Sequence, residues 1–193
     1  MHGMDAFSSL NPNNKTQLRE YAMNKHSQRG MTLIELIVTV TIVAILAAAA
    51  TPSLREMMEN NRLTALNNQL VSTLNYARAE AVKRNQNVNM CVRKADGSGC
   101  STTASDGFDK GWLVLVETSG EILLDVAPDT NGVTITNSDL TTPQQVSYRP
   151  MGKSKNAATF TLALAGVNRY QVVIALNTGR VRSCKVPVGQ TSC

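Results

Sequence analysis

Three patterns of hydrophobic and polar positions follow one another along the chain, and the first is a long apolar run. From Leu36 to Leu54, 19 consecutive residues carry no formal charge, and most of them are Val, Ile, Leu or Ala. A helix of roughly 20 apolar residues, rising about 1.5 Å per residue, spans the ~30 Å hydrocarbon core of a bilayer. The run therefore predicts a transmembrane helix over residues 31–54, with Glu35 as the only acid in it.

The second pattern is a helical stripe that continues beyond Pro52. Its apolar residues recur at steps of three and four: Leu63, Leu66, Leu70, Leu74, Ala77 and Ala81. This spacing places them on one face of an α-helix. We expect one long helix from about Met31 to Asn85, whose second half packs on a soluble domain. Because proline removes a backbone donor, Pro52 is expected to kink or loosen this helix.

The third pattern has a period of two, which is typical of strands that alternate with Gly, Asn, Asp, Ser and Pro turns. The expected strands are Val88–Val92, Trp112–Val116, Ile122–Val126, Val133–Thr136, Val146–Arg149, Phe160–Leu164 and Tyr170–Leu176. The polar segment Asp96–Asp109 predicts a loop. Together these elements predict an α+β fold, in which the long N-terminal helix packs on an antiparallel β-sheet and residues 55–193 form one soluble head domain.

Glu35 is unusual because an unpaired carboxylate in hydrocarbon costs on the order of several kcal/mol, so an acid there predicts a function. Residues 30 to 35 read Gly-Met-Thr-Leu-Ile-Glu, and Pro52 follows further on. This segment resembles the processing and assembly segment of type IV prepilins and type II secretion pseudopilins. The alternatives are a secretory signal peptide cut near Ala47–Ala50 and a plain membrane anchor, which leaves Glu35 without a role.

The prepilin resemblance implies a cleavage site and an assembly contact. A prepilin peptidase would cut between Gly30 and Met31 and methylate the new amino terminus, and Glu35 would pair with the Met31 amine of a neighbouring subunit. Other pilins of the filament are therefore implied partners. Before assembly the protein would cross the inner membrane of a Gram-negative bacterium once, and afterwards it would lie in an extracellular pilus. Lys25 and Arg29 favour a cytoplasmic amino terminus.

Residues 1–30 form the expected leader. Met23 offers a second possible start, which would leave a basic leader of eight residues ending at Gly30. The sequence leaves both starts open.

Four cysteines lie beyond the membrane segment: Cys91, Cys100, Cys184 and Cys193. Their even number and exported context predict disulfides, for which three pairings are possible. The local choice pairs Cys91 with Cys100 and Cys184 with Cys193, each pair enclosing eight residues. A zinc site is the alternative, but the chain has no Cys-x-x-Cys and both histidines precede Gly30, so we expect no metal.

Residues 31–193 contain no histidine, no Gly-x-Gly-x-x-Gly, no Walker loop and no Gly-x-Ser-x-Gly. Asp106 and Asp109 could act as a general acid and base, but both fall in the predicted solvated loop. We therefore expect a structural or binding protein, with no enzymatic activity and no cofactor.

Charge is divided unevenly between the two parts of the chain. Residues 31–139 contain eight basic and twelve acidic residues, whereas residues 140–193 contain seven basic residues and no acid. The seven are Arg149, Lys153, Lys155, Arg169, Arg180, Arg182 and Lys185. This asymmetry favours an anionic partner such as nucleic acid. The alternative is a solvated face, or a face that contacts acidic neighbouring subunits.

Residues 177 to 184 read Asn-Thr-Gly-Arg-Val-Arg-Ser-Cys, in which the Asn-Thr-Gly stretch predicts a tight turn. Arg180 and Arg182 are two positions apart, so on an extended segment both guanidinium groups point to the same side. Each can bind a phosphate through two hydrogen bonds. A Cys184–Cys193 disulfide would hold this tail against the domain.

The stretches Tyr148–Gly152 and Val173–Arg182, together with Gly111-Trp112, resemble the GspH/FimT family of minor pilins. In that family a Gly-Arg-x-Arg signature, here residues 179 to 182, marks the FimT-type branch, whose members bind DNA for uptake in natural transformation. The resemblance implies binding of double-stranded DNA. With the charge asymmetry, it predicts a site with Arg180, Arg182 and Lys185 as its core, which Arg149, Lys153, Lys155 and Arg169 would extend. A priming minor pilin without DNA binding and a GspH-like pseudopilin of type II secretion are the alternatives.

Overall fold

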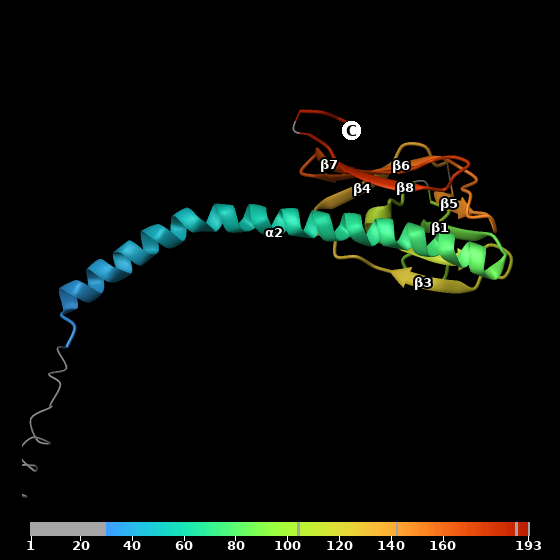
Figure 1. Ribbon diagram of the computed structural model, residues 1–193. Coiled ribbons are helices and arrows are strands. Elements are labelled where there is room, and N and C mark those ends of the chain that lie inside the picture. Colours follow the sequence, from blue (N-terminus) through green and yellow to red (C-terminus); the bar gives the residue numbers. More distant parts are fainter. Residues whose placement is uncertain (1–29, 104, 142, 188, 193) are drawn as a thin grey trace, which may run out of the picture. The chain divides into compact units, whose positions relative to one another are not determined.

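The computed structural model describes residues 30–103, 105–141, 143–187 and 189–192. The chain divides into two compact units, Met1–Thr51 and Pro52–Cys193. The elements are one long helix, α2 (Leu33–Arg84), a short 3-10 helix, η1 (Phe108–Lys110), and eight strands: β1 (Val88–Val92), β2 (Trp112–Val116), β3 (Ile122–Val126), β4 (Val133–Asn137), β5 (Gln145–Tyr148), β6 (Ala158–Leu164), β7 (Val167–Ile174) and β8 (Val181–Lys185) (Figure 1).

The first unit contains the beginning of α2. The backbone N–H of Glu35 donates to Oγ1 of Thr32 over 3.3 Å, so Thr32 caps the first turn of the helix. Thr32 and Glu35 thus have the spacing of a capping box, in which a hydroxyl residue is followed three positions later by Glu. By length and composition, α2 contains a stretch that could cross a membrane.

In the second unit, the predicted stripe of α2 is buried. The six apolar residues of the stripe, from Leu63 to Ala81, are at most 4% exposed and form the helix side of the core. On the sheet side, Trp112 is fully buried, and its indole N–H donates to Oγ1 of Thr73 over 3.2 Å. The contact ties β2 to α2 and satisfies the one polar atom of the indole ring. The predicted α+β class, a long helix packed on antiparallel strands, is confirmed.

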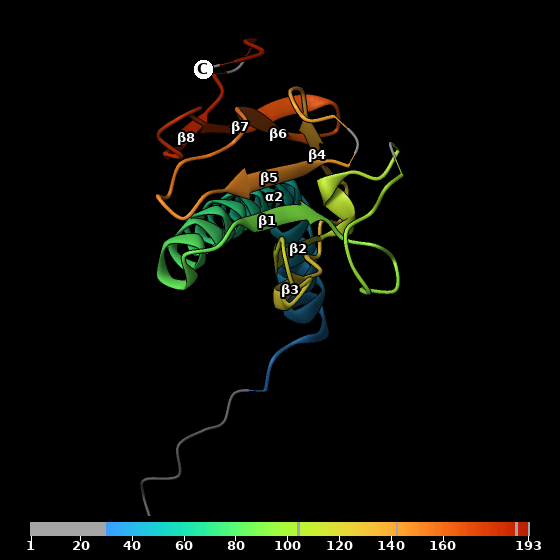
Figure 2. The same ribbon diagram turned by 90° about the vertical axis from the view of Figure 1, so that its right-hand side faces the viewer.

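The strands form two four-stranded antiparallel sheets rather than one, in the orders β3-β2-β1-β5 and β4-β6-β7-β8. Figure 2 shows the strands of the second sheet together at the top of the view, with β1, β2 and β3 below them. Two hydrogen bonds join the second sheet to α2. Tyr170 Oη lies 3.1 Å from Thr64 Oγ1, and the hydroxyl of Ser183 donates to Oδ1 of Asn67 over 2.7 Å.

The segment predicted as a loop is pinned at both ends. Cys91 and Cys100 form a disulfide that closes its first part, as the local pairing predicted. Near the other end, η1 carries Phe108, which is fully buried and packs edge-to-face on Phe160 with 4.8 Å between ring centroids. The loop therefore contributes a core residue that its polar composition concealed.

Candidate nucleic-acid interface

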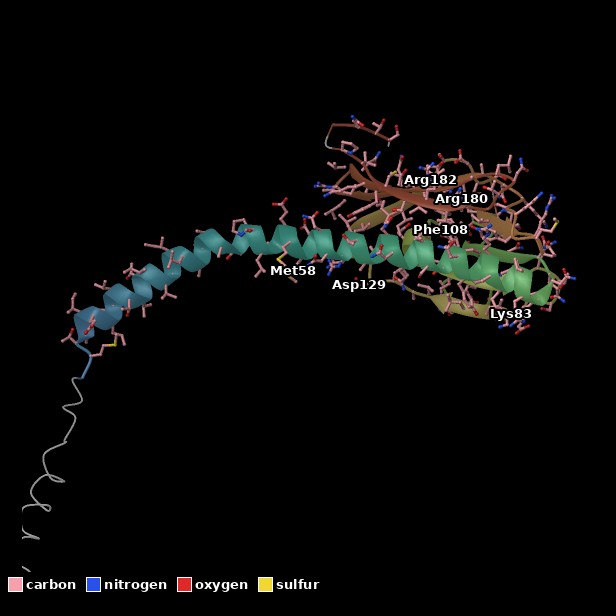
Figure 3. The ribbon with its side chains drawn as sticks, viewed as in Figure 1. Met58, Lys83, Phe108, Asp129, Arg180 and Arg182 are labelled. Carbon is pink, nitrogen blue, oxygen red and sulfur yellow. A yellow bond between two sulfur atoms is a disulfide. The ribbon has the colours of Figure 1, made fainter. Side chains whose placement is uncertain are left out.

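Arg182 lies on β8, an edge strand of the second sheet, and Arg180 immediately precedes this strand (Figure 3). Arg182 is paired in register with Val173 of β7, and the ladder extends to Arg180, whose carbonyl accepts from the N–H of Ala175 over 3.0 Å. Both arginines are exposed. Because side chains alternate along a strand, the two arginines share a face, as the sequence predicted.

That face points away from the helix. Val181 packs on the core and Ser183 bonds to Asn67 of α2, so the intervening Arg182 projects from the outer side of the sheet. Lys185 has the parity of Ser183 and so belongs to the opposite face from Arg182. It was expected at the centre of the basic site, and the alternation of the strand separates it from the two arginines.

The C-terminal tail is fastened to the same sheet. The side-chain amide groups of Asn168 and Gln171, both on β7, donate to the carbonyl of Thr191 over 3.1 Å each. Cys184 is disulfide-bonded, but Cys193 lies outside the described residues. The pairing of these two cysteines therefore stays a prediction.

The two sequence stretches that carry the family resemblance meet in space. Gly179, in the turn before β8, has φ +64°, and a Cβ added there would lie 2.3 Å from the carbonyl oxygen of Gly152. Only glycine allows this approach. The contact places the turn that carries Arg180 against the turn of residues 149–153, which carries Arg149 and Lys153. Both of these cations are exposed.

Arg78 of α2 is hydrogen-bonded to both turns. Its Nε donates to the carbonyl of Gly152 over 2.9 Å, and its Nη2 donates to the carbonyl of Thr178 over 3.1 Å. In the sequence, Arg78 is only a polar residue that follows Ala77 of the apolar stripe. Its partners are 74 and 100 residues away along the chain, so no local pattern reveals this role.

The ion pairs separate the basic residues into two groups. Lys155 forms an ion pair of 2.8 Å with Glu117, and this hydrogen-bonded ammonium lowers the pKa of the Glu117 carboxyl below its ordinary value. Its charge is already balanced, so we leave Lys155 out of the site. Among the described residues, the other six predicted cations form no ion pair: Arg149, Lys153, Arg169, Arg180, Arg182 and Lys185.

Arg169 is the least accessible of these six. It lies on β7 and is half-buried, its Nε is buried without a hydrogen-bond partner in the described structure, and its carbonyl accepts from the N–H of Val186. With Lys155, Lys185 and Arg169 set aside, four exposed cations without an ion pair remain among the described residues, Arg149, Lys153, Arg180 and Arg182, and we call these the basic end of the head. In the described part of the chain, no cluster of three or more His, Cys, Asp or Glu side chains is arranged to hold a metal ion.

The predicted processing residues lie at the start of the described chain. Gly30 and Met31 are exposed and precede α2, and Glu35 is exposed in its first turn. Both possible starts, Met1 and Met23, and the rest of the leader up to residue 29 lie outside the described residues.

A family model described as type II transport protein GspH matches residues 66–179, which is more than half of the chain. The chain belongs to the GspH family. A second model, the prokaryotic N-terminal methylation motif, matches residues 25–51 and includes Gly30, Met31 and Glu35. The GspH match spans α2 from Leu66 onward, seven strands and the turn that ends at Gly179.

Two crystal forms of the type IV minor pilin FimU from Pseudomonas aeruginosa strain PAO1 are similar to this GspH-family chain. The form in space group P21 is 20% identical, with a TM-score of 0.50 over 65% of this chain and 90% of that chain. The form in P65 is 19% identical, with a TM-score of 0.49 over 66% and 94%. The P21 form shows that the fold is that of a type IV minor pilin. No curated protein matches the chain.

Proposed function

We propose that this protein is a FimT-type minor pilin that binds extracellular double-stranded DNA for uptake in natural transformation. The observation that carries the proposal is the basic end of the head: Arg149, Lys153, Arg180 and Arg182 are exposed and have no acidic partner among the described residues, and the turn before Arg180 packs on the turn that carries Arg149 and Lys153.

Phosphate contacts account for the binding. Arginine presents a planar fork of donors that matches a phosphate, and unpaired cations lose no internal ion pair when they bind one. Contacts of this kind do not depend on base sequence, so the affinity falls steeply with salt. The backbone that carries Arg180 and Arg182 is hydrogen-bonded to β7 and its continuation, and Ser183 of β8 is bonded to Asn67 of α2, which reduces the ordering cost of binding.

The test is a DNA titration with residues 52–193, a compact unit that contains the whole core. Arg180→Gln with Arg182→Gln removes two cations. The slope of log K against log salt is expected to decrease in magnitude by about 1.8, because each phosphate contact contributes about 0.9. The matched control is Arg55→Gln with Lys94→Gln, which removes two exposed charges away from the basic end. If the arginine variant binds as tightly as the control, the proposed site is wrong.

Deletion of the gene distinguishes the remaining roles. Loss of transformation with intact pili supports DNA uptake. Loss of piliation supports a priming minor pilin, and loss of protein secretion supports a pseudopilin.

The methylation motif supports a further proposal for the amino terminus. We infer that prepilin peptidase cuts after Gly30, that Met31 becomes the methylated amino terminus, and that Glu35 pairs with the amine of a neighbouring pilin. The apolar part of α2 then holds the subunit in the inner membrane before assembly and among other pilins in the pilus afterwards.

A further inference from the structure

The turn of residues 149–153 carries an exposed apolar side chain that folding does not explain. Met151 is 79% exposed, the highest value among the exposed large hydrophobic residues of the described chain. Full burial of a methionine side chain contributes a favourable transfer free energy to folding, and Met151 gains little of it because most of its surface is exposed. Met151 lies between the exposed cations Arg149 and Lys153.

The turn is rigid as well as exposed. Two backbone hydrogen bonds of 2.8 Å close it, from Gly152 N–H to the Arg149 carbonyl and from Arg149 N–H to the Lys153 carbonyl. Pro150 restricts its backbone further. Arg78 bonds to the Gly152 carbonyl, and Gly179 packs on the same oxygen. The turn therefore loses little conformational entropy when a partner binds it.

Each of the two turns carries an exposed apolar side chain. Besides Met151, Leu176 in the turn before β8 is 50% exposed. On the side of α2, an open hollow of about 510 Å³ is lined by Met151, Ala79 and Val82 and also by the polar side chains of Asn75, Arg78 and Lys83. An apolar tip beside a hollow, flanked by unpaired cations, suits a partner that offers both stacked bases and phosphates.

We propose that this turn, residues 149–153, is a wedge that enters the minor groove of bound duplex DNA, with Met151 against the bases and Arg149 and Lys153 on the flanking phosphates. The proposal rests on the DNA binding proposed above. The minor groove is about 6 Å wide, and a single tight turn suits it better than the roughly 12 Å major groove, which admits a helix or a two-stranded ribbon. Apolar wedges such as methionine unstack base steps there and bend the duplex.

The experiment uses the full chain in nanodiscs of neutral phosphatidylcholine and an end-labelled duplex that reports bending by energy transfer. Met151→Ser is expected to lower the affinity about tenfold, since the contact buries one methionine side chain. The salt slope should not change, because no charge is removed. The bend should decrease, and netropsin, a minor-groove ligand, should compete with the wild type whereas methyl green, a major-groove ligand, should not. The control is Ile122→Ser, which removes an exposed apolar residue from β3.

Wild-type affinity and bending in Met151→Ser would overturn the wedge, and so would competition by methyl green alone. Binding of the wild type to vesicles of phosphatidylglycerol that Met151→Ser abolishes, with DNA binding unchanged, would assign the turn to a lipid surface instead. These results are distinct from failure of the proposed function, in which the wild type itself shows no salt-dependent binding.

Discussion

Substitution of Arg78 tests whether one helix residue holds the basic end together. Arg78→Gln removes the hydrogen bonds to Gly152 and Thr178, of 2.9 and 3.1 Å. A hydrogen bond from a charged donor contributes about 1.5–3 kcal/mol. Because the side chain is half-exposed and water replaces part of each bond, we expect a total loss of about 2 kcal/mol in the free energy of unfolding. At roughly 4 °C per kcal/mol for a domain of this size, Tm should fall by about 8 °C.

Thermal unfolding of residues 52–193, followed by circular dichroism, measures this change. Arg78→Lys keeps the charge but not the fork that reaches two carbonyls, so it should lose about half as much as the glutamine variant. Lys94→Gln removes an exposed charge that has no side-chain hydrogen bond in the described structure and should stay within about 0.5 kcal/mol of the wild type. If the Tm of Arg78→Gln equals that of Lys94→Gln, the hydrogen bonds from Arg78 to the two turns do not stabilise the domain.

Three further changes test other parts of the structure. Cys91→Ala with Cys100→Ala opens a loop of sequence separation 9 and should cost about 2.5 kcal/mol in denaturant titration; an unchanged midpoint would show that the loop is held without the disulfide. The pKa of Glu117 is lowered in the folded state, so the stability advantage of the wild type over Lys155→Gln should be constant above pH 4.5, the ordinary pKa, and disappear as the pH falls through the folded value. An advantage that persists below that range would exclude the ion pair as its source. Gly30→Leu should leave the leader attached, which mass spectrometry of the amino terminus detects, and normal processing of the variant would place the cut elsewhere.

The regular elements followed from local pattern. The expected helix from Met31 to Asn85 is observed as Leu33–Arg84, and the stripe that defined its inner face is buried throughout. The sequence reveals such a face because the residues that are buried recur at a fixed spacing along the helix. The strand β8 was expected only as an extended segment, since Arg182 and Lys185 interrupt its apolar alternation.

The sequence pattern did not predict correctly which basic residues group together. The sequence identified Arg180 and Arg182 and predicted their common face, but it grouped Lys155 and Lys185 with them. Ion pairing with Glu117 removes Lys155, and strand parity removes Lys185. The parity of Lys185 could be counted from the sequence once residues 181–185 were known to form a strand. The pair of Lys155 could not, because Glu117 lies 38 residues away along the chain and its approach is a property of the tertiary structure. The bridge made by Arg78 was missed for the same reason.

The burial of Trp112 gives the protein an intrinsic optical reporter. It is the only tryptophan of the chain, and its indole lies between β2 and α2 with its N–H bonded to Thr73. Its emission should therefore shift to longer wavelength when the helix separates from the sheet. Because it is fully buried and belongs to the other sheet from Arg182, ligands at the basic end should leave the spectrum unchanged. Unfolding and DNA binding can thus be followed independently in one unlabelled sample.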